Sequence, residues 1–278
     1  MGLTADEKER FEAVSRVADD DSLYTDALGF LSECLSRYHG HNAFILIDEY
    51  DVPLENAYLH GFYDKMIGFI RSLFESALKT NPYLEKGVIT GCLRISKESV
   101  FTGLNNLAVE SILSMNYPGA FGFTEPEVKA MMEYFDRADQ YPELKKWYDG
   151  YCLGECHIYN PIAVVNLVTK GKFKSYWSET GTYEAIVPLL NMDFEGLKTA
   201  IIEMLGGSRA EIDVSSFQND MVSFANRDDV LTYLIHLGYL GYDEDAEAAF
   251  VPNEEIRQEL TKAIRRNAWD EMIQNQRC

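Results

Sequence analysis

The sequence predicts an α/β protein: a small parallel sheet flanked by helices, then a mostly helical region and a helix–hairpin–helix end. Three observations predict this class. The apolar run Ala43–Ile47 stops abruptly at acidic residues, a second run over residues 87–91 ends in small polar ones, and helical periodicities surround both. Strands that alternate with helices are typical of parallel sheets with right-handed crossovers.

Composition and charge restrict the class of protein further. The 278 residues are 46% hydrophobic and 13% aromatic, which is typical of a globular protein with a sizeable core. A formal net charge of −20 disfavours binding to a phosphate backbone, so we expect no nucleic-acid partner. No apolar run reaches membrane-spanning length, the first residues lack a signal-peptide pattern, and the five cysteines are scattered. We therefore expect a cytoplasmic protein without a membrane contact.

The first 47 residues predict helices followed by a strand. Residues 1–40 are acidic with helical spacing, and Gly40 is expected to end the last helix in a left-handed conformation. The run Ala43–Ile47 has no period-two alternation, which predicts a central strand covered by helices on both faces. Pro53, close behind, argues against a buried helix here.

Two further strands are expected before residue 124. A helical stretch over residues 62–78 leads to the second strand, Gly87-Val88-Ile89, which Thr90 and Gly91 follow. A third strand is expected around residues 120–123. Thr124 and Glu127 then form a capping-box pattern, which predicts a helix from there to about Phe135.

Helices dominate the remainder of the chain. Asn160 and Pro161 read as the N-cap and first residue of a helix, and two more helices are expected over residues 183–206. A helix from Asp228, a hairpin over residues 239–251 and a helix capped by Asn253 resemble a winged-helix unit. We expect three regions: an α/β core over 1–135, a helical lid over 136–225 and a winged-helix-like unit over 226–278.

Asp48 and Glu49 form the strongest candidate site. They stand at the carboxyl end of a predicted strand, where open α/β sheets bind ligands. Carboxylates cannot be buried there unpaired, so a metal ion or another cation is their natural complement. The alternative is an acidic surface loop in an acidic protein.

Five motifs in series carry a resemblance to a known family: LIDEYDVPL (46–54), GVITGCLRISKESVFTGLNNL (87–107), FGFTEPEV (121–128), WYDGY (147–151) and YNP (159–161). In this order they resemble the AAA-ATPase-like family of bacterial P-loop proteins, over about residues 20–260. The family often carries a PD-(D/E)XK nuclease-like domain after the ATPase.

The resemblance implies a P-loop NTPase-like sheet that uses Mg²⁺ and ATP. It identifies IDEYD as Walker B, so that Asp48 would hold a Mg²⁺-bound water, Glu49 would polarise the attacking water, and Thr90 would face the γ-phosphate. Arg94 and Lys97, after the second strand, are candidates to neutralise phosphate charge, which phosphoryl transfer requires. They are also candidates to pair with nearby acids such as Asp51.

The Walker A pattern, GxxxxGK followed by Ser or Thr, is missing from the sequence. Relative to the family, we expect an N-terminally shortened member that also ends before any nuclease-like domain. Loss of the P-loop strand is expected to expose strand edges, which favours a protein partner or self-association. We expect the chain alone to be less stable than its size suggests and to bind Mg-ATP weakly or not at all.

Other patterns indicate less. Cys152, Cys156 and His157 lack the second ligand pair of a zinc site, and the acidic wing over residues 243–247 disfavours DNA. The alternative function is a non-catalytic interaction or regulatory module on the same scaffold. A third alternative, a two-carboxylate hydrolase, requires a second acid opposite Glu49, and the sequence indicates none.

Overall fold

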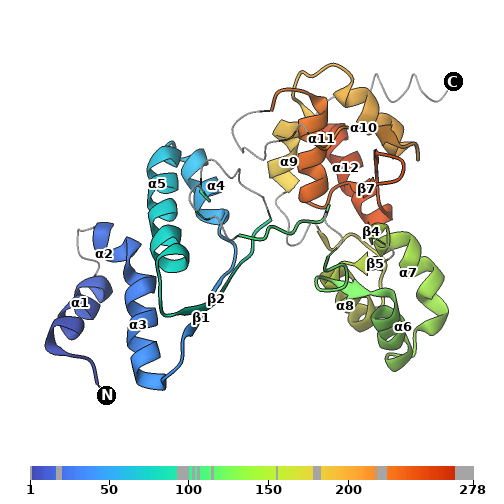
Figure 1. The fold of residues 1–278 in the computed structure, drawn as a ribbon. Helices are drawn as coiled ribbons and strands as arrows, with labels where there is room; N and C mark the ends of the chain where they lie inside the picture. The colour runs from blue at the N-terminus through green and yellow to red at the C-terminus, as the bar shows by residue number, and fades with distance from the viewer. Residues whose placement is uncertain are drawn as a thin grey trace. The chain divides into compact units, whose positions relative to one another are not determined.

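The computed structural model describes residues 2–16, 21–92, 100–101, 104, 107–113, 116–154, 156–177, 183–215, 217 and 224–266. The chain forms two compact units, shown in Figure 1. Unit 1 comprises residues 1–108 and 218–221, and unit 2 comprises residues 109–217 and 222–278. The described residues contain many helices, one two-stranded parallel sheet and two three-stranded antiparallel sheets, so the predicted mixed α/β class is confirmed.

Unit 1 begins with the helices α1 (Ala5–Ser15), α2 (Asp21–Thr25) and α3 (Ala27–His39). Thr4 and Glu7 form a capping box at the start of α1. Gly40 ends α3 with a φ of 77°, and its N–H donates to the carbonyl of Ser36, as the sequence predicts.

A parallel strand pair forms the sheet of unit 1. β1 (Ala43–Ile47) pairs with β2 (Leu84–Ile89), with Leu46 opposite Val88 and Ile47 opposite Ile89. The crossover between the strands runs through three helical elements: α4 (Val52–Leu59), α5 (Tyr63–Phe74) and the π-helical turn η1 (Glu75–Lys79). The predicted strand–helix–strand order is therefore confirmed.

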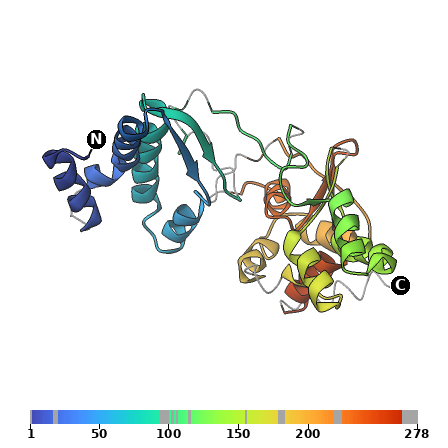
Figure 2. The same ribbon diagram turned by 90° about the horizontal axis from the view of Figure 1, so that it is seen from below.

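One face of this sheet is covered and the other is exposed. Ile45 is buried, and a Cβ on Gly87 would lie 2.7 Å from Leu78 Cδ2, so these positions face the helices. Figure 2 shows α3 and α5 on one side of the strand pair. Phe44, Leu46 and Val88, on the opposite face, are 65%, 74% and 41% exposed. Coverage of β1 on both faces is therefore wrong within the described part of the chain.

Unit 2 first builds an antiparallel sheet between helices. Its elements are β3 (Phe123–Thr124), α6 (Glu125–Tyr134), the 3₁₀ turn η2 (Ala138–Gln140), α7 (Tyr141–Tyr148), β4 (Tyr151–Leu153), β5 (Cys156–Tyr159) and α8 (Pro161–Lys170). The strand order is β3-β5-β4. The third expected strand therefore forms later than predicted, and it pairs with β5 rather than with the parallel pair. The capping box of Thr124 and Glu127 is confirmed.

The remainder of unit 2 forms a second core. It contains α9 (Tyr183–Leu190), α10 (Leu197–Leu205), β6 (Ala210–Glu211), α11 (Arg227–His236), β7 (Gly241–Asp243), β8 (Ala248–Phe250) and α12 (Glu254–Arg266). The predicted helix, hairpin and helix are present, and β6 completes the sheet β6-β8-β7. Asn253 Oδ1 accepts from the Ile256 N–H at 3.0 Å, as expected for a cap.

The WYDGY segment joins the two cores of unit 2. Tyr151 Oη donates to the carbonyl of Gly238 at 2.7 Å. Gly150 has a φ of 114°, and a Cβ there would lie 2.0 Å from the carbonyl oxygen of Pro252. The motif therefore holds a close backbone contact that only glycine permits. No helix among the described residues is long and apolar enough to cross a membrane.

Candidate functional site

The loop that follows β1 is hydrogen-bonded to the residue that follows β2. The Thr90 N–H donates to the carbonyl of Ile47 at 2.8 Å, and the Tyr50 N–H donates to the carbonyl of Thr90 at 3.1 Å. The parallel ladder therefore continues past the strand ends. This continuation places Asp48 and Thr90 side by side at the carboxyl edge of the sheet.

Asp48 is oriented by groups from both strands. Its Oδ1 accepts a short hydrogen bond from Thr90 Oγ1 and a second from the Glu49 N–H at 3.1 Å. Both bonds fall on Oδ1, and the Asp48 side chain is exposed to solvent. A carboxylate held in this way keeps its direction while it remains accessible to a cation.

Glu49 has a strained backbone. Its φ is 52°, in the left-handed region that residues with a Cβ rarely adopt, and its side chain is exposed. Such a conformation costs about 1–2 kcal/mol and persists only where the surroundings fix it. The turn therefore holds Glu49 at the rim of the sheet at an energetic cost.

Buried neighbours fix the rest of this loop. The Tyr50 ring packs edge-on against Phe101, with centroids 5.2 Å apart. Asp51 is the N-cap residue of α4 and is buried. Gly91 lies directly beneath both residues: a Cβ there would be 2.6 Å from Asp51 Oδ1 and 2.7 Å from the Tyr50 ring. The absence of a side chain at Gly91 lets the two strand ends approach.

The local electrostatic field is negative. We call the side chains Asp48, Glu49, Asp51 and Glu55 the acidic cluster. Burial raises the pKa of the Cys92 thiol, and the charges of the acidic cluster raise this pKa further. The thiol of Cys92 therefore senses the charge of the cluster, and a cation is the complement that the cluster favours.

The fit to Mg²⁺ follows from the number of ligands. Among the described residues, no group of three or more His, Cys, Asp and Glu side chains is arranged to hold a metal ion. Mg²⁺ commonly takes only one or two protein carboxylates and completes its shell with water and phosphate oxygens. Asp48, exposed and oriented, fits that mode of binding.

The predicted site residues are thus only partly described. Asp48, Glu49 and Thr90 lie together, whereas Arg94 and Lys97 are outside the described residues. Tyr50 and Gly91, which fix the loop, were missed by sequence reasoning. The small residue directly after Thr90 is the signal that points to a close approach of the two strand ends.

Residues 3–101 match the AAA-ATPase-like family, described as predicted AAA-ATPases. The resemblance drawn from the motifs is therefore confirmed over this range, which contains the acidic cluster and Thr90. A protein of Azotobacter chroococcum mcd 1, described as uncharacterized and encoded in the 5′ region of vnfD, is 32% identical over 152 residues. The match covers 54% of this chain and 29% of that protein, so the chain spans under a third of its relative's length. No solved structure matches.

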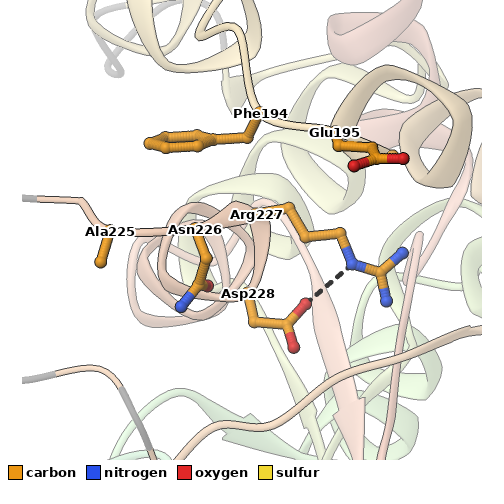
Figure 3. Close-up of a pocket in the computed structure, with 7 residues that line it drawn as sticks. Phe194, Glu195, Ala225, Asn226, Arg227 and Asp228 are labelled. Carbon is orange, nitrogen blue, oxygen red and sulfur yellow. Dashed lines mark hydrogen bonds and ion pairs between the residues drawn. The ribbon is translucent and has the colours of Figure 1, made fainter.

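Unit 2 contains a hollow that lies outside residues 3–101, the part of the chain that matches the family. This hollow of about 560 Å³ is shown in Figure 3 and is lined by Phe194, Glu195, Gly196, Ala225, Asn226, Arg227 and Asp228. Arg227 Nε bonds Asp228 Oδ1 at 3.0 Å, and Arg227 Nη2 donates to the carbonyl of Glu211 at 3.1 Å. The guanidinium group of Arg227 is thus already bonded to Asp228 and to the Glu211 carbonyl. The acidic cluster therefore remains the candidate site.

Proposed function

We propose that unit 1 is the metal-binding and nucleotide-binding part of an AAA-ATPase-like protein, in which the complete protein hydrolyses Mg-ATP. The hydrogen bond between Asp48 and Thr90 carries this proposal. It joins the ends of two adjacent parallel strands at the rim where such sheets bind ligands. The family match over the same residues supports it.

In this proposal each residue has a separate task. Asp48 would hold a water molecule that is bound to Mg²⁺. Thr90 fixes the direction of the Asp48 carboxylate, and Thr90 itself would face the terminal phosphate. Glu49 accepts a hydrogen bond from the attacking water. The metal, when bound, polarises phosphate oxygens and offsets their charge. Arg94 and Lys97 remain proposed phosphate contacts.

The chain by itself is proposed to bind Mg-ATP weakly, because the sequence offers no Walker A pattern to cradle the β-phosphate. Unit 1 then corresponds to part of a P-loop NTPase-like sheet. The three strands and surrounding helices at the end of unit 2 support the assignment of a winged-helix-like unit there. The proposed helical lid lies in the sequence between the α/β core and this unit. The acidic composition and scattered cysteines support a cytoplasmic location.

The metal site is tested through Cys92. Mg²⁺ bound at Asp48 offsets the negative field, lowers the pKa of the Cys92 thiol and therefore speeds its alkylation at mildly alkaline pH. Site-resolved mass spectrometry measures this rate with and without Mg²⁺, and the exposed Cys152 of unit 2 serves as the internal reference. Asp48→Asn is expected to abolish the response, whereas Asp64→Asn, an exposed acid at the start of α5, is expected to keep it.

Nucleotide binding and hydrolysis need separate measurements. Micromolar binding of Mg-ATP in calorimetry contradicts the weak-binding proposal. Phosphate release that is lost in Glu49→Gln supports hydrolysis by this chain. No release from either chain favours the second candidate, a non-catalytic interaction module, which the exposed apolar face of the sheet also supports.

A further inference from the structure

The exposed face of the parallel sheet has an ordered pattern of side chains. In the register of the strands, Phe44 lies opposite Lys86 and Leu46 lies opposite Val88. Asp48 and Thr90 follow two residues later on each strand, and their hydrogen bond places them together. We call these six residues the bare face. It is basic at one end, apolar in the middle and acidic at the other end.

A parallel sheet with one uncovered apolar face is unusual in folded proteins. All-parallel sheets occur almost only with both faces covered, and an isolated pair of strands is marginally stable in water. The large exposure of Phe44 and Leu46 therefore indicates a surface that another layer covers. The charges at its two ends limit which layer fits.

A second copy of the same chain fits this pattern. When two bare faces pack with a two-fold axis through Leu46 and Val88, each surface meets itself in the opposite direction. The end of each copy that carries Lys86 then lies against the end of the other that carries Asp48. Lys86 lies over Thr90 of the other copy, where its long side chain can reach the neighbouring Asp48 carboxylate, and Leu46 and Val88 meet at the centre. Packing in the same direction instead brings the two ends that carry Lys86 together and the two ends that carry Asp48 together, which is unfavourable.

We propose that the bare face is the interface of a symmetric homodimer, held by Phe44, Leu46 and Val88 and by reciprocal pairs of Lys86 with Asp48. The apolar area is small compared with that of a permanent dimer, so the dimer is weak and depends on concentration. The proposal goes beyond nucleotide binding and is tested in a chelator, where no Mg²⁺ reaches Asp48.

Sedimentation equilibrium of the full chain in EDTA measures the dimer. We expect the monomer to associate as concentration rises, and Leu46→Glu or Lys86→Glu to weaken association by more than about tenfold. Lys65→Glu, the same charge change at an exposed site on α5, and Tyr134→Glu, on α6, are matched controls that keep it. All these positions are exposed, and circular dichroism checks that each variant folds.

Charge reversal separates this pairing from unspecific association. An Asp48→Lys chain repels itself through Lys86, and a Lys86→Glu chain repels itself through Asp48, but the two chains complement one another when mixed. We expect each alone to be monomeric and the mixture to form heterodimers. A wild-type chain that stays monomeric at every concentration overturns the proposal. So does a dimer that persists in Leu46→Glu and Lys86→Glu, which indicates a different interface.

Discussion

At the scale of single residues, the candidate site depends on one position where a side chain is excluded. Gly91→Ala places a Cβ 2.6 Å from Asp51 Oδ1 and 2.7 Å from the Tyr50 ring, and both neighbours are buried. We expect a loss of about 1–3 kcal/mol in the free energy of unfolding, because the strand ends must separate. Urea denaturation measures it.

A matched control distinguishes crowding from a general effect of glycine. A Cβ on Gly68, in the helix α5, meets no atom within 4 Å. Gly68→Ala is therefore expected to stabilise the chain by about 0.5–1 kcal/mol. If Gly91→Ala is also stabilising, the close approach of the two loops does not exist in solution.

Glu49 supplies the second prediction at this scale. Glycine adopts a φ of 52° without strain, so Glu49→Gly is expected to stabilise unit 1 by about 1 kcal/mol. The same variant removes the proposed contact with the attacking water. Thermal unfolding measures the gain, and Glu49→Gln, which keeps the Cβ, is expected to show none. A destabilised Glu49→Gly variant contradicts the assigned strain.

At the scale of elements, the sequence was sufficient where a pattern is local. Gly40, Asn253 and the pair Thr124 and Glu127 set helix ends that the structure confirms. The juxtaposition of Asp48 with Thr90 was also predictable, because adjacent parallel strands end at the same edge. The positive φ of Glu49 was not, since no neighbouring residue type requires it.

The errors at this scale have physical causes. Every residue of Ala43–Ile47 is apolar, so the run does not reveal whether a second layer comes from this chain. The structure covers only one face within its described residues. The third strand is two residues long, and its partner residues, Ile158 and Tyr159, lie more than thirty positions further along the chain. Such a distant pairing leaves no local signal.

Helix α12 carries a titratable contact between the two cores of unit 2. Glu255 Oε1 accepts from the N–H groups of Tyr176 and Trp177 at 2.6 and 2.9 Å, and burial raises the pKa of Glu255. A carboxyl whose folded pKa is raised contributes stability below its unfolded pKa and loses it as the pH rises through the folded pKa.

The neutral variant Glu255→Gln keeps an acceptor oxygen at the same place. We therefore expect its free energy of unfolding, relative to the wild type, to increase as the pH rises above the ordinary range of Glu. At acidic pH the two chains are expected to converge. Urea denaturation at several pH values measures this difference. A difference that stays constant with pH means that ionisation of Glu255 is not coupled to folding.

At the scale of the whole molecule, the proposed metal site and the proposed dimer share one carboxylate. The Asp48 carboxylate cannot bind a Mg²⁺-bound water and the ammonium group of the partner's Lys86 at full strength at the same time. If Mg²⁺ binds the monomer more tightly than the dimer, it shifts the association equilibrium toward the monomer by mass action. Mg²⁺ is therefore expected to weaken the dimer more than NaCl of equal ionic strength does, because NaCl only screens the charges.

Sedimentation equilibrium with each salt measures the two effects separately. Asp48→Asn removes the negative charge for which Mg²⁺ and the partner's Lys86 compete. The variant is therefore expected to dimerise weakly and to respond equally to the two salts. Asp64→Asn, which lies outside the bare face, is expected to keep the specific response to Mg²⁺. If Mg²⁺ and NaCl act equally on the wild-type dimer, the metal and the partner lysine do not compete for Asp48.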